Sequence, residues 1–374
     1  MKINTSALKM YRKFLEGIQD KTSQVGSSLY LDLDNKMVKF ATQNITGEFP
    51  LEVDEDNEFD FPGFFVTTSQ LMKLVEEFKE LEILPDKQFK GTNGLFDLTV
   101  LEENYTFPVF DRTLENPQKF IVTSSIAAKE DDDSKKIFQF LLEAKNFSEQ
   151  VDPTSPLSGV FVAGSSPDEK HVVGTDSSKF YDRKLIGVEN MDVPLSFMKV
   201  LEKIPSTEAI YGRKGNLLVA YVGDFIVQSG DSTTLGLPID IESEDFRLLY
   251  DHENKITVDL RAFSDLMKFM HSWSKEGASM NRLKFTFPEA NKLNVEITDG
   301  VRIEREIDVA MSDEEYFGKD KHFWMSSASL TEALRVLSSE NETELQISVD
   351  FDEPAVDFRI NENLHIVLVT LEDA

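Results

Sequence analysis

Three similar stretches decide the fold of this chain: Val66-Thr-Thr-Ser-Gln-Leu-Met-Lys-Leu-Val75, Val193-Pro-Leu-Ser-Phe-Met-Lys-Val-Leu201 and Ser326-Ser-Ala-Ser-Leu-Thr-Glu-Ala-Leu-Arg-Val-Leu337. Each has helical spacing of apolar residues and leads into a strand-like segment that begins with a glutamate: Glu80-Leu-Glu-Ile83, Glu208-Ala-Ile210 and Glu344-Leu-Gln-Ile347. The three copies are spaced by about 130 residues, which is the length of a whole domain and not of a solenoid unit.

Each copy is also expected to open with an amphipathic helix. In the first copy, Leu8, Tyr11, Leu15 and Ile18 form one apolar stripe among basic residues. The second helix is predicted over residues 134–147, and the third presents Phe263, Leu266, Met267 and Met270 on one face. Alternating segments separated by turn residues lie between these helices and predict antiparallel hairpins. The fold class is therefore α+β, with three repeated domains over residues 1–115, 120–247 and 254–374.

Composition fits a folded chain in a reducing compartment. The 374 residues are 40% hydrophobic and include 29 Phe, which suffices for a core in each domain. Cysteine is absent, so neither disulfides nor Cys-ligated zinc are expected. The N-terminus lacks the features of a signal peptide, and no run approaches the length of a membrane span. We expect a cytoplasmic protein.

Charge is strongly unbalanced, with 39 Lys+Arg against 68 Asp+Glu and a formal net charge of −29. Such a balance argues against a protein that binds nucleic acid over its whole surface. The basic residues, however, gather on the predicted helices, so the charge balance does not exclude a local nucleic-acid-binding surface formed by those helices.

Motifs for catalysis are absent from the sequence. The five histidines have no metal-ligand spacing, and no Walker loop, nucleophile elbow or dinucleotide-binding glycine pattern occurs. The acidic runs at 54–58 and 131–133 lack the glycine and terminal glutamate of an EF-hand and are read as solvated loops. We expect no enzyme activity, no metal and no cofactor.

Three later segments resemble the middle domain of the bacterial β sliding clamp, the DNA polymerase III beta subunit family. They are His171-Val-Val-Gly-Thr-Asp-Ser-Ser-Lys-Phe180, Tyr221-Val-Gly-Asp-Phe-Ile-Val227 and Leu237-Pro-Ile-Asp240. The chain end, His365-Ile-Val-Leu-Val-Thr370, is similar to the C-terminal strand of that family. Departures from the family pattern around Ser177 mean that the protein could be a bacteriophage version of the clamp as well as a cellular one. A bacteriophage version would be located in the host cytoplasm.

The resemblance implies a ring-shaped processivity factor that encircles double-stranded DNA without reading its sequence. Each clamp domain would line the ring with two helices and turn antiparallel sheets outward. Taken singly, each basic side chain is equally explained as a solvated helix face, and their recurrence in three copies favours the lining. The candidate DNA-facing residues are Lys9, Arg12, Lys13, Lys73, Lys135, Lys136, Lys199, Lys203, Arg261, Lys268, Lys275 and Arg335.

The family also holds peptides of the DNA polymerase and the clamp loader in a cleft between its middle and last domains. By matching position, the cleft here would contain Leu157, Thr175, Ser177, Ser178, Phe180, Pro238, Ile366, Leu368, Val369 and Thr370. The alternative is that the apolar members are only core.

Three domains per chain imply a homodimer in which two protomers close a ring of six domains. The candidate interface residues are Phe107, Val109, Met270 and Trp273. The predicted function is thus a DNA sliding clamp that tethers the replicative polymerase. The acidic surplus leaves one alternative, an acidic clamp-fold interaction protein or DNA mimic that binds another DNA-binding protein without encircling DNA.

Overall fold

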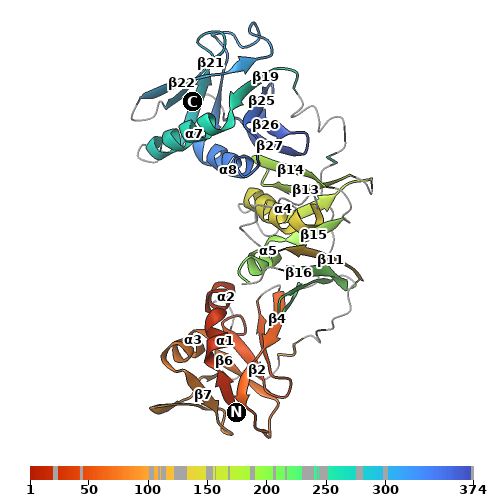
Figure 1. Cartoon of the computed structure of the whole chain (residues 1–374), viewed down its shortest axis with the longest axis vertical. Helices are drawn as coiled ribbons and strands as arrows, with labels where there is room; N and C mark the ends of the chain where they lie inside the picture. Colours follow the sequence, from red (N-terminus) through yellow and green to blue (C-terminus); the bar gives the residue numbers. More distant parts are fainter. Residues whose placement is uncertain are drawn as a thin grey trace. The chain divides into compact units, whose positions relative to one another are not determined.

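A computed structural model of the chain describes residues 1–19, 24–42, 45–100, 105–107, 110, 115–121, 133–148, 155, 157–166, 169–185, 190–204, 208–214, 217–229, 240–241, 243, 252–274, 281–297 and 302–371. The order strand, helix, hairpins, strand, helix, strands recurs three times along it (Figure 1). The predicted α+β organisation with a threefold repeat of elements is confirmed. Within the described residues, the helices are α1 (Thr5–Met10), α2 (Arg12–Ile18), α3 (Thr68–Glu77), α4 (Asp133–Ser148), α5 (Leu195–Leu201), α7 (Leu260–Ser274) and α8 (Ser327–Leu337).

The chain divides into two compact units, Met1–Leu142 with Val193–Thr234, and Glu143–Asp192 with Leu235–Ala374. Strand β15 (Met191–Pro194) lies where the chain passes from the second unit to the first. The predicted middle domain contributes strands to both units, because its sheets continue into sheets of the first and third copies. The division into three domains stays a prediction.

Unit 1 contains two antiparallel sheets. The smaller one has the order β5 (Val53–Glu55), β1 (Lys2–Asn4), β7 (Glu80–Ile83), β8 (Phe89–Gly91) and β9 (Gly94–Phe96). The larger one has the order β10 (Thr99–Val100), β6 (Gly63–Thr67), β2 (Ser28–Asp32), β3 (Met37–Ala41), β4 (Ile45–Pro50), β18 (Phe225–Ser229), β17 (Leu217–Val222), β16 (Glu208–Lys214) and β11 (Glu115–Ile121).

The junction of β4 and β18 joins the first and second copies within unit 1. Val227 pairs with Gly47 in an antiparallel register. The rings of Tyr11 and Phe14 lie with their centroids 4.7 Å and 4.9 Å from that of Phe225, and Phe49 completes the cluster at 4.8 Å. This aromatic packing stabilises the junction by burying large apolar side chains.

The first predicted helix differs from the single amphipathic helix expected from its stripe. It is two helices, α1 and α2, which meet at Tyr11 with backbone angles φ −91° and ψ 2°. The ring of Tyr11 packs against Phe49 and Phe225 instead of continuing the stripe. Leu8, Leu15 and Ile18 are buried as predicted.

Unit 2 also contains two antiparallel sheets. One runs through β12 (Gly159–Ala163), β13 (Lys170–Thr175), β14 (Lys179–Leu185), β27 (Leu364–Val369), β26 (Ala355–Asn361), β25 (Glu344–Val349), β19 (Lys255–Asp259) and β23 (Ala310–Met311). The other has the order β22 (Ile303–Asp308), β21 (Lys292–Ile297), β20 (Arg282–Thr286) and β24 (His322–Ser326). The pairing of β14 with β27 joins the second copy to the third.

Helices α7 and α8 pack side by side in unit 2 (Figure 1). Asp259 caps the start of α7 by accepting a hydrogen bond from the Ala262 N–H at 2.7 Å, and Ser326 caps α8 by accepting from the Ser329 N–H at 3.3 Å. The predicted apolar face of α7 is confirmed at Phe263, Met267 and Met270, all at most 1% exposed, whereas Leu266 is half-buried.

Candidate functional site

The pairing of β14 with β27 sorts their side chains onto two faces of one sheet. Phe180 lies opposite Val367, while its neighbours Lys179 and Tyr181 lie opposite Leu368 and Ile366. Directly paired residues of antiparallel strands project to the same face, and successive residues alternate. We call the side that carries Phe180 and Val367 the cluster face, and the side that carries Tyr181 and Leu368 the helix face.

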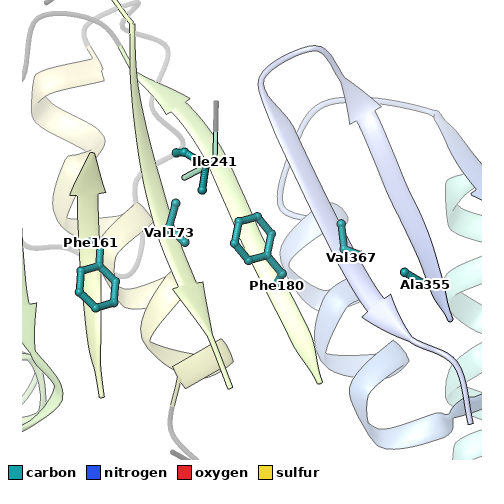
Figure 2. Packing of buried hydrophobic residues seen from close by; sticks show 6 residues of the cluster. All are labelled: Phe161, Val173, Phe180, Ile241, Ala355 and Val367. Atoms are coloured by element: carbon teal, nitrogen blue, oxygen red, sulfur yellow. The ribbon is translucent and has the colours of Figure 1, made fainter. Parts of the chain in front are cut away.

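The cluster face carries an apolar group drawn from several strands. It consists of Phe161, Val173, Phe180, Ile241, Ala355 and Val367, each at most 8% exposed. Figure 2 shows Phe180 of β14 between Val173 and Val367, with Ile241 from a separate segment beside them. The group spans the β14–β27 junction, so it forms one continuous buried cluster across two copies of the repeat, which we call the apolar floor.

The hairpin turn between β13 and β14 closes one end of this floor. The carboxylate of Asp176 accepts hydrogen bonds from the Ser178 N–H at 3.0 Å and the Ser178 hydroxyl at 2.7 Å. Ser177 has a φ of 70°, a left-handed conformation that glycine adopts more readily. The Val369 N–H donates to the Ser178 carbonyl at 2.9 Å, which fixes the turn to the end of β27.

Ion pairs on the helix face hold the same junction from the other side. Lys179 Nζ lies 2.6 Å from Glu332 of α8, and Arg183 lies 2.6 Å from Glu340, three residues beyond the end of α8. Burial disfavours a charged Arg183, but its neighbours Tyr181 and Glu340 outweigh that cost and raise its pKa. The Tyr181 hydroxyl donates to Glu143 at 2.9 Å, and burial together with Glu143 raises its pKa well above the ordinary value.

Polar residues continue the cluster face beyond Phe180. His171 Nδ1 lies 2.7 Å from Asp182, and His365 lies 3.6 Å from Asp357, which also pairs with Arg359 at 3.0 Å. Burial lowers the pKa of His171, but the hydrogen bond with Asp182 and the negative charge of that carboxylate together outweigh burial, and the pKa is raised. The His171–Asp182 pair therefore places buried charge next to the apolar floor.

The predicted cleft residues divide between the two faces. Thr175, Phe180 and the exposed Val369 belong to the cluster face, and Ser177 and Ser178 form the adjoining turn. Ile366 and Leu368 lie on the helix face at 0% and 1% exposure, so the structure does not bring them to the apolar floor. Leu157 and Thr370 are half-buried, and Pro238 lies outside the described residues.

Sequence reasoning did not nominate Val367, Val173, Phe161 or Ile241. The first of these could have been found, because alternation in β27 requires Val367 and not its neighbours to share a face with Val369. Which face of β27 lies on the same side of the sheet as Phe180 depends on the register between β14 and β27. A single sequence does not show the register between two strands that are far apart along the chain.

The predicted DNA-facing residues of unit 1 are largely exposed on helices. Lys9 of α1, Lys13 of α2, Lys73 of α3 and Lys199 of α5 are exposed. Arg12 is half-buried, 2.8 Å from Glu16 and also paired with Glu76. Lys203 is exposed and donates to the Gly17 carbonyl at 2.5 Å, which ties the end of α5 to α2.

Fewer of these residues can be placed in unit 2. Arg261 and Lys268 are exposed seven residues apart on α7, and Arg335 is exposed on α8. Lys268 has Asp265 at 3.7 Å, a solvated pair that offsets part of its charge. Lys135 and Lys136 belong to α4, but their side chains, like the whole of Lys275, lie outside the described part of the chain.

The predicted dimer-interface residues differ in accessibility. Phe107 is half-buried, with its ring centroid 4.9 Å from that of the exposed Tyr105. Trp273 is 41% exposed beside Phe269, which is 38% exposed, whereas Met270 is fully buried in α7. Val109 lies outside the described residues.

Among the residues that the structure describes, no group of three or more His, Asp or Glu is placed to hold a metal ion. Within those residues, no helix is both long and apolar enough to cross a membrane.

Among comparisons with known proteins, the one with solved structures identifies the architecture. No protein-family model matches the chain, and no curated protein sequence is significantly similar to it. Among solved structures, the DNA polymerase III subunit beta of Pseudomonas aeruginosa has a TM-score of 0.76 at 14% identity, covering 100% of both chains. The beta subunit from DNA polymerase of Streptococcus pyogenes has a TM-score of 0.75 at 11% identity, covering 100% of this chain and 99% of that one. From its first to its last residue, this chain has the fold of the DNA polymerase III beta subunit sliding clamps.

Proposed function

We propose that the protein is a DNA sliding clamp, a homodimeric ring that encircles duplex DNA and tethers a replicative polymerase in the cytoplasm. The observation that carries the proposal is the full-length match in fold to DNA polymerase III beta subunits, with 100% coverage of both chains in one case. A ring that holds DNA by linkage needs no catalytic group and no cofactor.

Electrostatics supports this assignment over the acidic DNA mimic. The chain carries a formal net charge of −29, yet exposed cations recur on α1, α2, α3, α5, α7 and α8. An acidic exterior disfavours non-specific binding, while basic helix faces match phosphates, whose contacts carry no sequence information. A DNA mimic has no need of such cations.

The cluster face is the proposed site for peptides of the polymerase and the clamp loader. Its floor is the apolar group around Phe180 and Val367, and its accessible rim includes Val369, which is 41% exposed. Ser177 and Ser178 at the turn are exposed and offer polar contacts. An extended peptide would combine main-chain hydrogen bonds with apolar side chains over the floor.

Retention on DNA of two topologies tests the proposal. A linked ring stays on a closed circular duplex at moderate salt and slides off the same duplex after linearisation. The assay uses the full chain, with a loader extract or with prolonged incubation so that rings can open. Equal loss from both templates would contradict topological binding, and displacement of another DNA-binding protein by a monomer would favour the acidic mimic.

Charge reversal tests the proposed lining. Lys9→Glu, Lys13→Glu and Lys73→Glu together are expected to reduce the amount of protein retained on circular DNA at least tenfold at moderate salt, because three phosphate contacts become repulsive and fewer rings close around the duplex. The matched control reverses Lys90, Lys319 and Lys321, which are exposed outside the helices. An equal loss in both variants would mean that net charge, and not the helix faces, governs retention.

A further inference from the structure

The side chain of Lys179 is buried on the helix face of the β14–β27 junction. The residue is only 4% exposed, and lysine is almost never buried to this degree unless its charge is paired. Its Nζ lies 2.6 Å from the carboxylate of Glu332 on α8 and donates to the carbonyl of Asn146 near the end of α4 at 3.0 Å. The centroid of the Phe147 ring lies 5.5 Å from the same Nζ. The ammonium group therefore makes its contacts inside the molecule, on the side of the sheet away from the cluster face.

The main chain of Lys179 ends the turn that borders the apolar floor. The carboxylate of Asp176 accepts a hydrogen bond from the Lys179 N–H at 3.0 Å, in addition to the two from Ser178. The Thr175 hydroxyl donates to the Lys179 carbonyl at 2.9 Å and accepts from the Ser177 N–H at 3.1 Å. Lys179 thus holds the turn through its backbone and contacts α4 and α8 through its side chain.

The same turn fixes the exposed rim of the floor. The Ser178 carbonyl accepts a hydrogen bond from the Val369 N–H at 2.9 Å, and Val369 is 41% exposed. A chain of contacts therefore runs from Glu332 on α8 through Lys179 and the turn to Val369. Glu332 lies on the opposite side of the sheet from the floor, because its partner Lys179 projects to the helix face. A peptide on the floor does not touch Glu332, so an effect of Glu332 on peptide binding must pass through Lys179.

We propose that Lys179 and Glu332 are positioning residues of the peptide site: their buried ion pair holds the Ser177–Ser178 turn in the conformation that receives a peptide, without contacting the peptide. The inference rests on the proposed peptide site and adds the residues that prepare it. A site whose loops are held before binding loses less conformational entropy when the ligand arrives, and this raises affinity. The turn needs such support, because Ser177 has a φ of 70°, a conformation that serine keeps only where its surroundings hold it.

Replacing both members of the ion pair separates positioning from stability. Glu332→Leu alone leaves the buried ammonium without its carboxylate and should destabilise the protein. The pair variant Lys179→Met/Glu332→Leu removes both charges and should recover most of that stability, because apolar side chains of similar volume replace many buried ion pairs at little cost. The pair variant still lacks the bonds from Lys179 Nζ to α4 and α8, so its turn is no longer fixed.

The chain offers a matched control on the same strand. Arg183→Met/Glu340→Leu removes a second ion pair of 2.6 Å between β14 and the segment that follows α8. Arg183 lies four residues farther along β14 than Lys179, away from the turn. The control therefore weakens the same junction and leaves every contact of Lys179 in place.

Two measurements on the full chain test the inference. Amide hydrogen exchange at Ser178 and Val369, measured without peptide, reports how firmly the turn is held. Peptide affinity is then measured by fluorescence anisotropy. The probes are peptides selected on the wild-type chain from a displayed library of random eight-residue peptides, and only those that Val369→Asp no longer binds are kept.

We expect the pair variant to exchange the Ser178 and Val369 amides about threefold to tenfold faster and to bind the peptides more weakly by a similar factor, because its turn must be ordered on binding. The control should match the wild type within about twofold in both measurements. Unchanged exchange or unchanged affinity in the pair variant, or equal changes in the control, would overturn the inference and leave the peptide site intact. Failure to select any Val369-dependent peptide would contradict the peptide site and the inference with it.

Discussion

His171 couples the cluster face to pH through its contact with Asp182. Burial lowers its pKa, but the hydrogen bond at 2.7 Å and the negative charge of Asp182 together raise it, while Lys184 lowers it and Glu169 raises it. Because the folded pKa is raised above the unfolded value of about 6.5, the stabilisation is complete below that value. It is lost as pH rises through the folded pKa.

The difference in unfolding free energy between wild type and His171→Gln should therefore be larger at pH 6 than at pH 8.5, as measured by urea denaturation. Asp182→Asn is the matched control, because it removes the partner and should abolish the pH dependence. A constant difference across this range would show that His171 is not charged in the folded protein.

Arg183 illustrates how a buried charge fixes the junction of two repeats. Its guanidinium lies 2.6 Å from Glu340, and the two side chains are only 11% and 21% exposed. Replacing Arg183 by Met leaves a carboxylate partly buried with its cation removed, which costs about 3 kcal/mol. Denaturation of Arg183→Met should show this loss, and the double variant Arg183→Met/Glu340→Leu should recover part of it. A double variant no more stable than the single one would contradict the pairing as the cause.

At the scale of elements, the β4–β18 junction depends on a close approach at Gly47. A Cβ atom there would lie 2.3 Å from the Phe40 ring and 2.7 Å from the Ile226 carbonyl. We expect Gly47→Val to destabilise unit 1 by about 2 kcal/mol or more through overpacking. Gly94→Ala is the control, because its Cβ would meet nothing closer than 3.5 Å. Equal thermal stability of the two variants would contradict this account of the junction.

The two faces of β27 make a second prediction at this scale. Leu368→Asp places a charge on the helix face at a position 1% exposed, so it should unfold the junction. Val369→Asp changes a side chain that is 41% exposed, so it should fold normally and lose peptide binding. Circular dichroism and the peptide assay separate the two effects, and normal folding of Leu368→Asp would contradict the assigned register.

The sequence alone predicts which segments form helices and strands better than it predicts which face of a strand each side chain lies on. The three helical stretches and the glutamates that follow them predicted α3, α5 and α8 and the strands after them, because helical period and turn residues are local signals. The break at Tyr11 and the placement of Phe180 opposite Val367 depend on packing between distant segments. Local patterns carry no information about such contacts. Ile366 and Leu368 are cleft candidates by matching position in the family resemblance, which does not show which face of β27 meets Phe180.

At the scale of the whole molecule, the threefold recurrence of elements gives the fold, while the proposed function rests on assembly. Exposed cations on the helices of an acidic chain fit the proposed ring, in which those helices would face DNA. Closing such a ring with three domains per chain requires a second copy of the chain, and exposed aromatic side chains such as Trp273 and Tyr105 would then become buried between protomers. The homodimer is therefore the central claim.

Light scattering across a dilution series at moderate salt measures this claim most directly. A ring of two protomers predicts a mass twice the 42.5 kDa of one chain that persists to low protein concentration. The interface variant Trp273→Glu should shift the dimer toward monomer without changing the circular dichroism spectrum of the protein. A mass of one chain at every concentration of the wild type would contradict the ring and, with it, the assignment of the basic helices to DNA.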